Sequence, residues 1–204
     1  MTSLLLLLLI GGCGTSTKVI GTWKKSEEIV YDYNKLVILG IAHNEATRKT
    51  FEIAIEEQML SAGLAGEGAL DFLPPNANED NTPPELVMAF FKSAKVDAVM
   101  TVSVVHIDDS RRHMPDALIY APYYTTYSFY DQYVEYYDWV YLPGYDTGEL
   151  DVFIEANLFD FESGNLIWSA QTETMALNSI SEIASNFSYV LVDDLVKSKV
   201  LISD

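Results

Sequence analysis

The stretch from Lys35 to Ala42 constrains the fold most, because it is a continuous apolar run rich in β-branched residues. An alternating pattern is typical of a strand with one face in water, whereas such a run predicts a strand covered on both faces and central in its sheet. Asn44 then stands at an N-cap position, and Gly63 can end a helix that runs through Ser61. Apolar residues recur at helical spacing between them: Phe51, Ala54, Ile55, Met59 and Leu60.

Three more elements are predicted before residue 110. Residues Gly66 to Leu73 allow a short strand. Thr82 can cap a second helix that holds Pro83 and Pro84 in its first turn, where the missing N–H of proline costs nothing. Residues Val96 to Ile107 are a second apolar run and predict a second buried strand.

A β-hairpin is predicted from Asp151 to Phe161 and from Leu166 to Thr174, because Gly164 between the two runs tolerates the positive φ of a tight turn. The apolar residues that share one face of the first run are Val152, Ile154, Ala156 and Leu158. Those expected to share one face of the second run are Leu166, Trp168 and Ala170.

The C-terminal part predicts a third helix, from Ser179 to Lys197, with Ser179 and Glu182 as a capping box. A short strand, Val200 to Ile202, can follow it. The whole order predicts an α/β (α+β) fold, a single-domain two-layer sandwich with a mixed sheet and the order β-α-β-α-β-(Tyr-rich insertion)-β-hairpin-α-β.

The N-terminus carries an apolar run from Leu4 to Ile10, which is shorter than the about 20 residues of a membrane-spanning helix but fits a secretory signal peptide. The only cysteine, Cys13, follows Gly11 and Gly12. The sequence Ile10-Gly11-Gly12-Cys13 resembles the bacterial lipobox, although Met1-Thr2-Ser3 lacks the usual positive charge. The other interpretation is a buried cysteine after a hydrophobic segment.

The lipobox resemblance implies that residues 1–12 are removed and that Cys13 is acylated, with palmitate among the chains, which gives stable attachment to a bilayer. Residues 13–34 are then expected to be the lipidated cysteine and a polar tether, and residues 35–204 the folded domain. Gly14 after the cysteine implies, by the same resemblance, the outer membrane with the domain facing the periplasm.

Composition limits the partners. The chain has 30 acidic against 12 basic residues and a formal net charge of −18. This charge repels phosphate backbones, so it argues against nucleic-acid binding, and it makes anionic lipid surfaces poor partners as well.

Several short sequences carry a resemblance to small bacterial envelope lipoproteins: Asp97-Ala98-Val99, Pro143-Gly144-Tyr145, Asn157-Leu158-Phe159-Asp160, Ser163-Gly164 and Ile167-Trp168-Ser169. With the first strand and helix, they look like the α/β module of CsgG, of penicillin-binding-protein activator lipoproteins and of the N-terminal domain of TolB. The likeness covers roughly residues 33 to 203. It implies an accessory role in envelope assembly and no active-site residues, because the fold group shares no chemistry.

Ten of the thirteen tyrosines lie between Tyr120 and Tyr145. Tyrosine offers a large contact area with little rotamer entropy and a polar hydroxyl. Such a segment can pack as an ordered insertion, recognise an envelope protein, or stack on the sugars of peptidoglycan. The residues proposed for partner binding are Tyr124, Tyr127, Tyr130, Tyr133 and Trp139.

Two patterns are similar to catalytic sites. His106, Asp108 and His113 are suited to a metal, but Arg111 and Arg112 would compete for the carboxylates. Asp146-Thr147-Gly148 occurs once, whereas aspartic proteases need two aspartates. We therefore expect a non-enzymatic protein without cofactor or metal, and the alternative is an envelope hydrolase or metal-dependent enzyme that uses the His106/Asp108/His113 loop.

Overall fold

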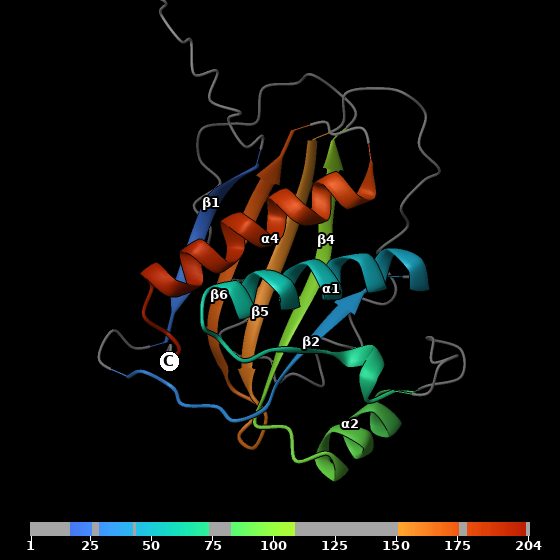
Figure 1. The fold of residues 1–204 in the computed structure, drawn as a ribbon, viewed down its shortest axis with the longest axis vertical. Helices are drawn as coiled ribbons and strands as arrows, with labels where there is room; N and C mark the ends of the chain where they lie inside the picture. Colours follow the sequence, from blue (N-terminus) through green and yellow to red (C-terminus); the bar gives the residue numbers. More distant parts are fainter. Residues whose placement is uncertain are drawn as a thin grey trace, which may run out of the picture.

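The computed structural model describes residues 17–25, 29–42, 44–73, 83–108, 151–175 and 179–202, and of these it leaves the side chains of 84, 105–108 and 151 undescribed. They form a six-stranded mixed sheet with the strand order β1-β6-β5-β4-β2-β3 (Figure 1). The strands are β1 (Thr17–Lys24), β2 (Leu36–Ile41), β3 (Glu67–Gly68), β4 (Ala98–Asp108), β5 (Asp151–Asp160) and β6 (Leu166–Thr174). The helices are α1 (Glu45–Ser61), the 3₁₀ turn η1 (Ala69–Asp71), α2 (Pro84–Ser93) and α4 (Ile180–Lys197).

Strand β2 runs parallel to both of its neighbours, β3 and β4, and the other strand pairs are antiparallel. All six β2 residues are buried, as the continuous apolar run predicts. The α+β class and the mixed sheet are therefore confirmed.

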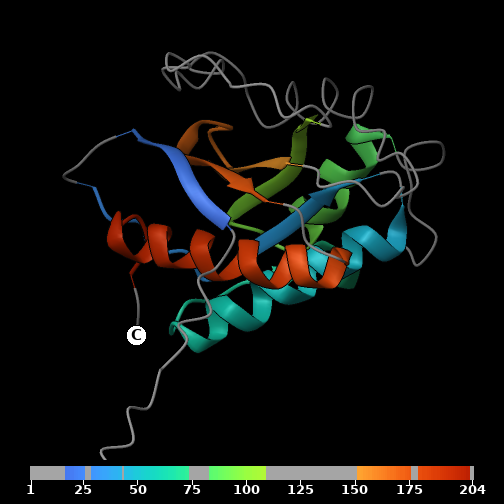
Figure 2. The same cartoon turned by 90° about the horizontal axis from the view of Figure 1, so that it is seen from above.

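Helices α1 and α4 lie side by side across one face of the sheet, as Figure 2 shows from above. Their apolar faces meet the sheet in the main core, where the rings of Phe51 and Phe187 contact edge to face at 5.8 Å between centroids. A second core, around Val37 and Phe91, packs α2 and η1 against the opposite face. The expected helical layer is present, and α2 adds a partial layer behind the sheet.

The prediction of a tether over residues 13–34 is wrong for Thr17–Lys24, which form β1 at the edge of the sheet and pair antiparallel with β6. An edge strand buries few of its residues, so β1 keeps exposed polar positions that resemble those of a linker. The pairing partner, Thr174 for Thr17, is also far away in the sequence. The local pattern therefore could not reveal this strand.

The hairpin of β5 and β6 is confirmed, and Gly164 adopts a positive φ of 69° in its turn. Leu166, however, lies in the second core and not with Trp168 and Ala170 in the first. The register of β5 and β6 shifts there, because Leu158 pairs with Trp168 but Phe159 pairs with Leu166. The extra residue in β6 is a bulge, and it turns Leu166 to the other face of the sheet.

The predicted caps of two helices are confirmed. The side chain of Asn44 accepts hydrogen bonds from the N–H groups of Ala46 and Thr47, at 2.8 and 3.2 Å. That of Ser179 accepts one from the N–H of Glu182 at 3.2 Å. Each cap satisfies backbone donors that the first helical turn leaves free.

Three finer predictions differ from the structure. Leu60 is 76% exposed, because it lies on the outer side of α1. The N-cap residue of α2 is Pro83, and Thr82 lies outside the described residues. The predicted strand at 200–202 is only a single bridge between Leu201 and Tyr31, and the predicted strand at 66–73 shortens to the two residues of β3 before η1 begins.

Candidate functional site

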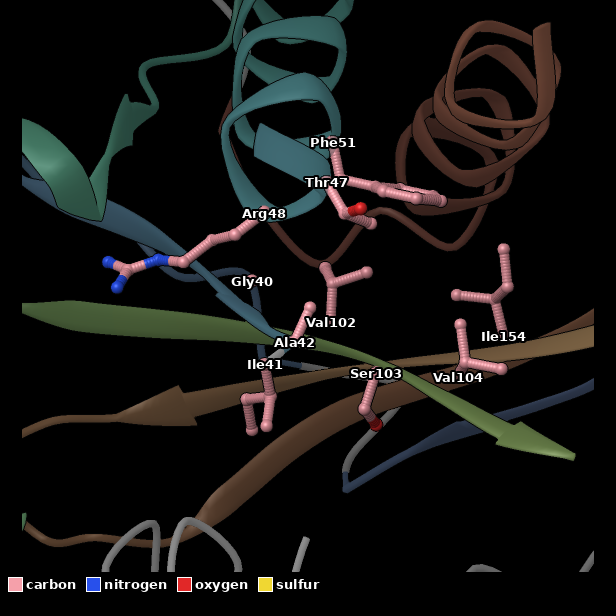
Figure 3. Close-up of a pocket in the computed structure, with 10 residues that line it drawn as sticks. All are labelled: Gly40, Ile41, Ala42, Thr47, Arg48, Phe51, Val102, Ser103, Val104 and Ile154. Atoms are coloured by element: carbon pink, nitrogen blue, oxygen red, sulfur yellow. The ribbon is translucent and has the colours of Figure 1, made fainter. Parts of the chain in front are cut away.

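A small pocket lies where β2 ends, where its parallel pairing with β4 therefore stops, and where α1 begins (Figure 3). In sheets with parallel strands, ligands bind outside the carboxyl ends of the strands. The cavity measures about 20 Å³, which is room for one water molecule. Its lining is mostly apolar and consists of Gly40, Ile41, Ala42, Thr47, Arg48, Phe51, Val102, Ser103, Val104 and Ile154.

The Arg48 guanidinium points away from Ser103, Val104 and Ile154, and its stem lies beside Gly40 (Figure 3). A Cβ atom on Gly40 would come within 3.0 Å of the Arg48 Cγ. Glycine at this position therefore lets α1 approach β2 closely. The pocket itself presents no charged group to a ligand at its centre.

The Arg48 side chain forms a buried ion pair with Glu52, one helical turn later. Arg48 Nε donates to Glu52 Oε1 at 2.7 Å, and the two side chains are only 4% and 2% exposed. Arg48 Nη2 is buried and has no hydrogen-bond partner in the described part of the chain. The pair faces the sheet, whereas charged helix residues commonly face water.

Glu52 also joins three elements. Its Oε1 accepts the N–H of Gly40 at 3.0 Å, and its Oε2 accepts the N–H of Leu70 at 3.1 Å. Strand β3 ends at Gly68, opposite Ile38, so it offers no backbone acceptor to the N–H of Gly40. The Glu52 carboxylate accepts that N–H in place of a neighbouring strand. We assign Glu52 a structural role, which is to hold α1, β2 and η1 together.

Burial raises the pKa of Glu52, and the Arg48 guanidinium and the two N–H donors offset this shift only in part. A buried carboxylate with a raised pKa is one mark of a functional site. All of its observed partners, however, belong to the fold, so the geometry explains the residue without a ligand.

A second polar group lies on the sheet face opposite α1 and α4. Glu155 and Asn157 of β5 are 5% and 1% exposed, and Asn157 Nδ2 donates to Glu155 Oε1 at 2.6 Å. The register sets Ser103 opposite Glu155, and both Thr101 and Ser169 opposite Asn157. Five buried polar side chains therefore form a row across three strands.

The row combines a carboxylate, an amide and hydroxyl groups, all of which form hydrogen bonds. The Asn157 Oδ1 atom is buried and accepts no hydrogen bond from any described residue. Sequence reasoning missed the row since it followed only the apolar alternate positions of β5. The signal was present: Glu155 and Asn157 occupy the other alternate positions of the same strand.

The structure leaves most of the sequence-predicted site residues outside its described part. These are Cys13, Tyr124, Tyr127, Tyr130, Tyr133, Trp139 and His113. The backbone of His106 and Asp108 belongs to the end of β4, past a register shift after Val104. The described residues contain no group of three or more His, Cys, Asp or Glu side chains placed to hold a metal ion.

No helix among the described residues is both long enough and apolar enough to span a membrane.

No protein-family model matches the sequence, and no curated protein sequence matches it either. Among solved structures, the chain is similar to the PelC dodecamer from Paraburkholderia phytofirmans, with 13% identity, a TM-score of 0.48 and coverage of 92% of this chain and 99% of that one. A variant of the same protein has 16% identity, a TM-score of 0.45 and coverage of 84% and 94%.

The chain is also similar to lipoprotein GNA1162 from Neisseria meningitidis, with 13% identity, a TM-score of 0.40 and coverage of 80% of this chain and 98% of that one. None of these three structures is of CsgG, a penicillin-binding-protein activator or TolB, so the resemblance to those families stays a prediction.

Proposed function

We propose that this protein is a bacterial envelope lipoprotein, held in the outer membrane by acylated Cys13, whose α+β domain is a non-enzymatic binding or assembly accessory in the periplasm. One observation carries the anchoring part of the proposal. The first strand of the sheet begins at Thr17, four residues after Cys13. Cleavage before Cys13 would therefore remove no described element of the domain.

The accessory role rests on the composition and on the tyrosine-rich segment. Between Tyr120 and Tyr145 the chain concentrates ten tyrosines. Asp108 and Asp151, which flank this stretch, pair at the end of β4 and the start of β5. The segment is thus attached to a rigid sheet, and rigid elements are good supports for a recognition surface. An envelope protein or peptidoglycan is the proposed partner.

The anchor is tested by replacing Cys13 with serine in the full-length protein. We expect the unaltered protein to incorporate labelled palmitate and to fractionate with membranes. Cys13→Ser should lose the palmitate label, because serine has no thiol to acylate. Any of this variant that remains in the membrane fraction should be the uncleaved precursor. Equal palmitate labelling in both proteins, measured after gel separation, would contradict the proposal.

The binding role is tested by crosslinking in cells, followed by affinity capture. A variant with Ser at Tyr124, Tyr127, Tyr130 and Tyr133 should lose a specific envelope protein, or should no longer sediment with peptidoglycan. A Tyr189→Phe variant is the matched control, because Tyr189 is 53% exposed and lies on α4, outside the segment. Unchanged capture together with a lower thermal midpoint would show that the tyrosines only pack.

A further inference from the structure

The first residue of β1 is held firmly in the sheet. Thr17 is 4% exposed, pairs with Thr174, and its Oγ1 lies 2.9 Å from Thr174 Oγ1 in a buried side-chain hydrogen bond. Four Cα steps separate Cys13 from Thr17, and a fully extended chain covers at most about 14 Å in four steps. The anchoring residue therefore stays near one particular end of the sheet.

The strand directions identify that end. Thr17 pairs with Thr174, Thr174 with Val152, and Val152 with Ile107. The start of β1 thus lies beside the end of β6, the start of β5 and the end of β4, as Figure 1 shows at the tips of the β4 and β6 arrows. Helix α4 also begins at this end, shortly after β6.

The opposite end of the sheet lies a full strand away. Strand β6 has nine residues, so its ends lie about 26 Å apart at 3.3 Å per step. That end carries the β5–β6 turn with the exposed residue Glu162. At the anchored end, Met175 directly follows β6 and is 52% exposed.

We propose that the short connection orients the domain on the membrane: the end of the sheet formed by Thr17, Ile107, Val152 and Thr174 faces the bilayer, and the β5–β6 turn points away from it. This inference rests on the proposed acylation of Cys13. The partner is the surface of the bilayer that holds the lipid anchor. Zwitterionic headgroups suit it, because the net charge of −18 repels anionic ones.

Nitroxide quenching on vesicles tests the orientation. The full-length lipidated protein is reconstituted in phosphatidylcholine vesicles that contain a lipid with a nitroxide on its headgroup. Met175→Cys and Glu162→Cys variants carry a thiol-linked fluorophore, while acylation blocks Cys13. We expect quenching to be several-fold stronger at position 175 than at position 162. Equal quenching, or stronger quenching at position 162, would overturn the proposal.

A linker variant shows whether the short connection is the cause. Twenty Gly/Ser residues inserted between Ser16 and Thr17 would have a root-mean-square span of about 25 Å, comparable to the length of the sheet. We expect this insertion to abolish most of the difference between the two positions. A difference that persists would overturn the role of the connection.

The intact mass of the protein separates this inference from the lipoprotein proposal. Acylated Cys13 with equal quenching at both positions would reject the orientation alone. Unmodified Cys13 and no vesicle binding would reject the lipoprotein proposal and the orientation with it.

Discussion

Replacing Glu52 with alanine is expected to lower the free energy of unfolding by about 3 to 5 kcal/mol, the range measured when one partner of a buried ion pair is removed. The loss is large because Arg48, 4% exposed, would keep a buried charge without its counterion. The N–H groups of Gly40 and Leu70 would also lose their acceptor. Urea denaturation followed by circular dichroism measures the change.

A matched control lies on the same helix. Glu57 is exposed, so Glu57→Ala should change the unfolding free energy by less than about 0.5 kcal/mol, as is usual for surface substitutions. A double variant, Arg48→Met with Glu52→Leu, should recover the part of the loss that comes from the unpaired Arg48 charge, because apolar residues can replace a buried ion pair at little cost. The part that comes from the Gly40 and Leu70 N–H groups should remain, because leucine has no acceptor for them. Equal effects of Glu52→Ala and Glu57→Ala would refute the structural role of Glu52.

Trp168→Ala is expected to cost about 3 to 5 kcal/mol, the usual range for removing a large aromatic side chain from a core. Trp168 is 0% exposed and lies in the main core between the sheet and the helices. Most domains have only about 5 to 15 kcal/mol of stability, so the variant would lose a large part of it. Calorimetry and chemical denaturation measure the shift.

Two further variants make this second experiment specific. Trp168→Phe keeps most of the volume and should lose clearly less stability than Trp168→Ala. Trp23→Ala removes a tryptophan that is only partly buried, on the other side of the sheet, and should also cost less. A loss for Trp23→Ala as large as that for Trp168→Ala would contradict the burial difference between them.

Elements with strong local signals were predictable from the sequence. Strand β2 combines a continuous apolar run with burial on both faces, and α1 combines helical spacing with a side-chain cap at Asn44. The turn at Gly164 needs a positive φ that glycine adopts without strain. In each case the signal and the structure involve residues only a few positions apart.

The candidate polar sites were not predictable in the same way. Arg48 and Glu52 are charged helix residues, and such side chains usually point into water. Only the end of β3 at Gly68 explains why the Glu52 carboxylate is buried against β2. Glu155 and Asn157 form a polar row only because β4 and β6 bring hydroxyl groups opposite them. These arrangements depend on residues from different parts of the chain.

By itself, then, the sequence determined the α+β class, the caps of α1 and α4, the hairpin and the apolar runs that form the core, since caps, turns and periodicity act within a few residues. Only the tertiary structure decided that Thr17–Lys24 join the sheet, that Leu166 changes face and that Glu52 is buried. The physical reason is that edge pairing, bulges and buried ion pairs gain their stability from partners distant in the chain, which no local pattern specifies.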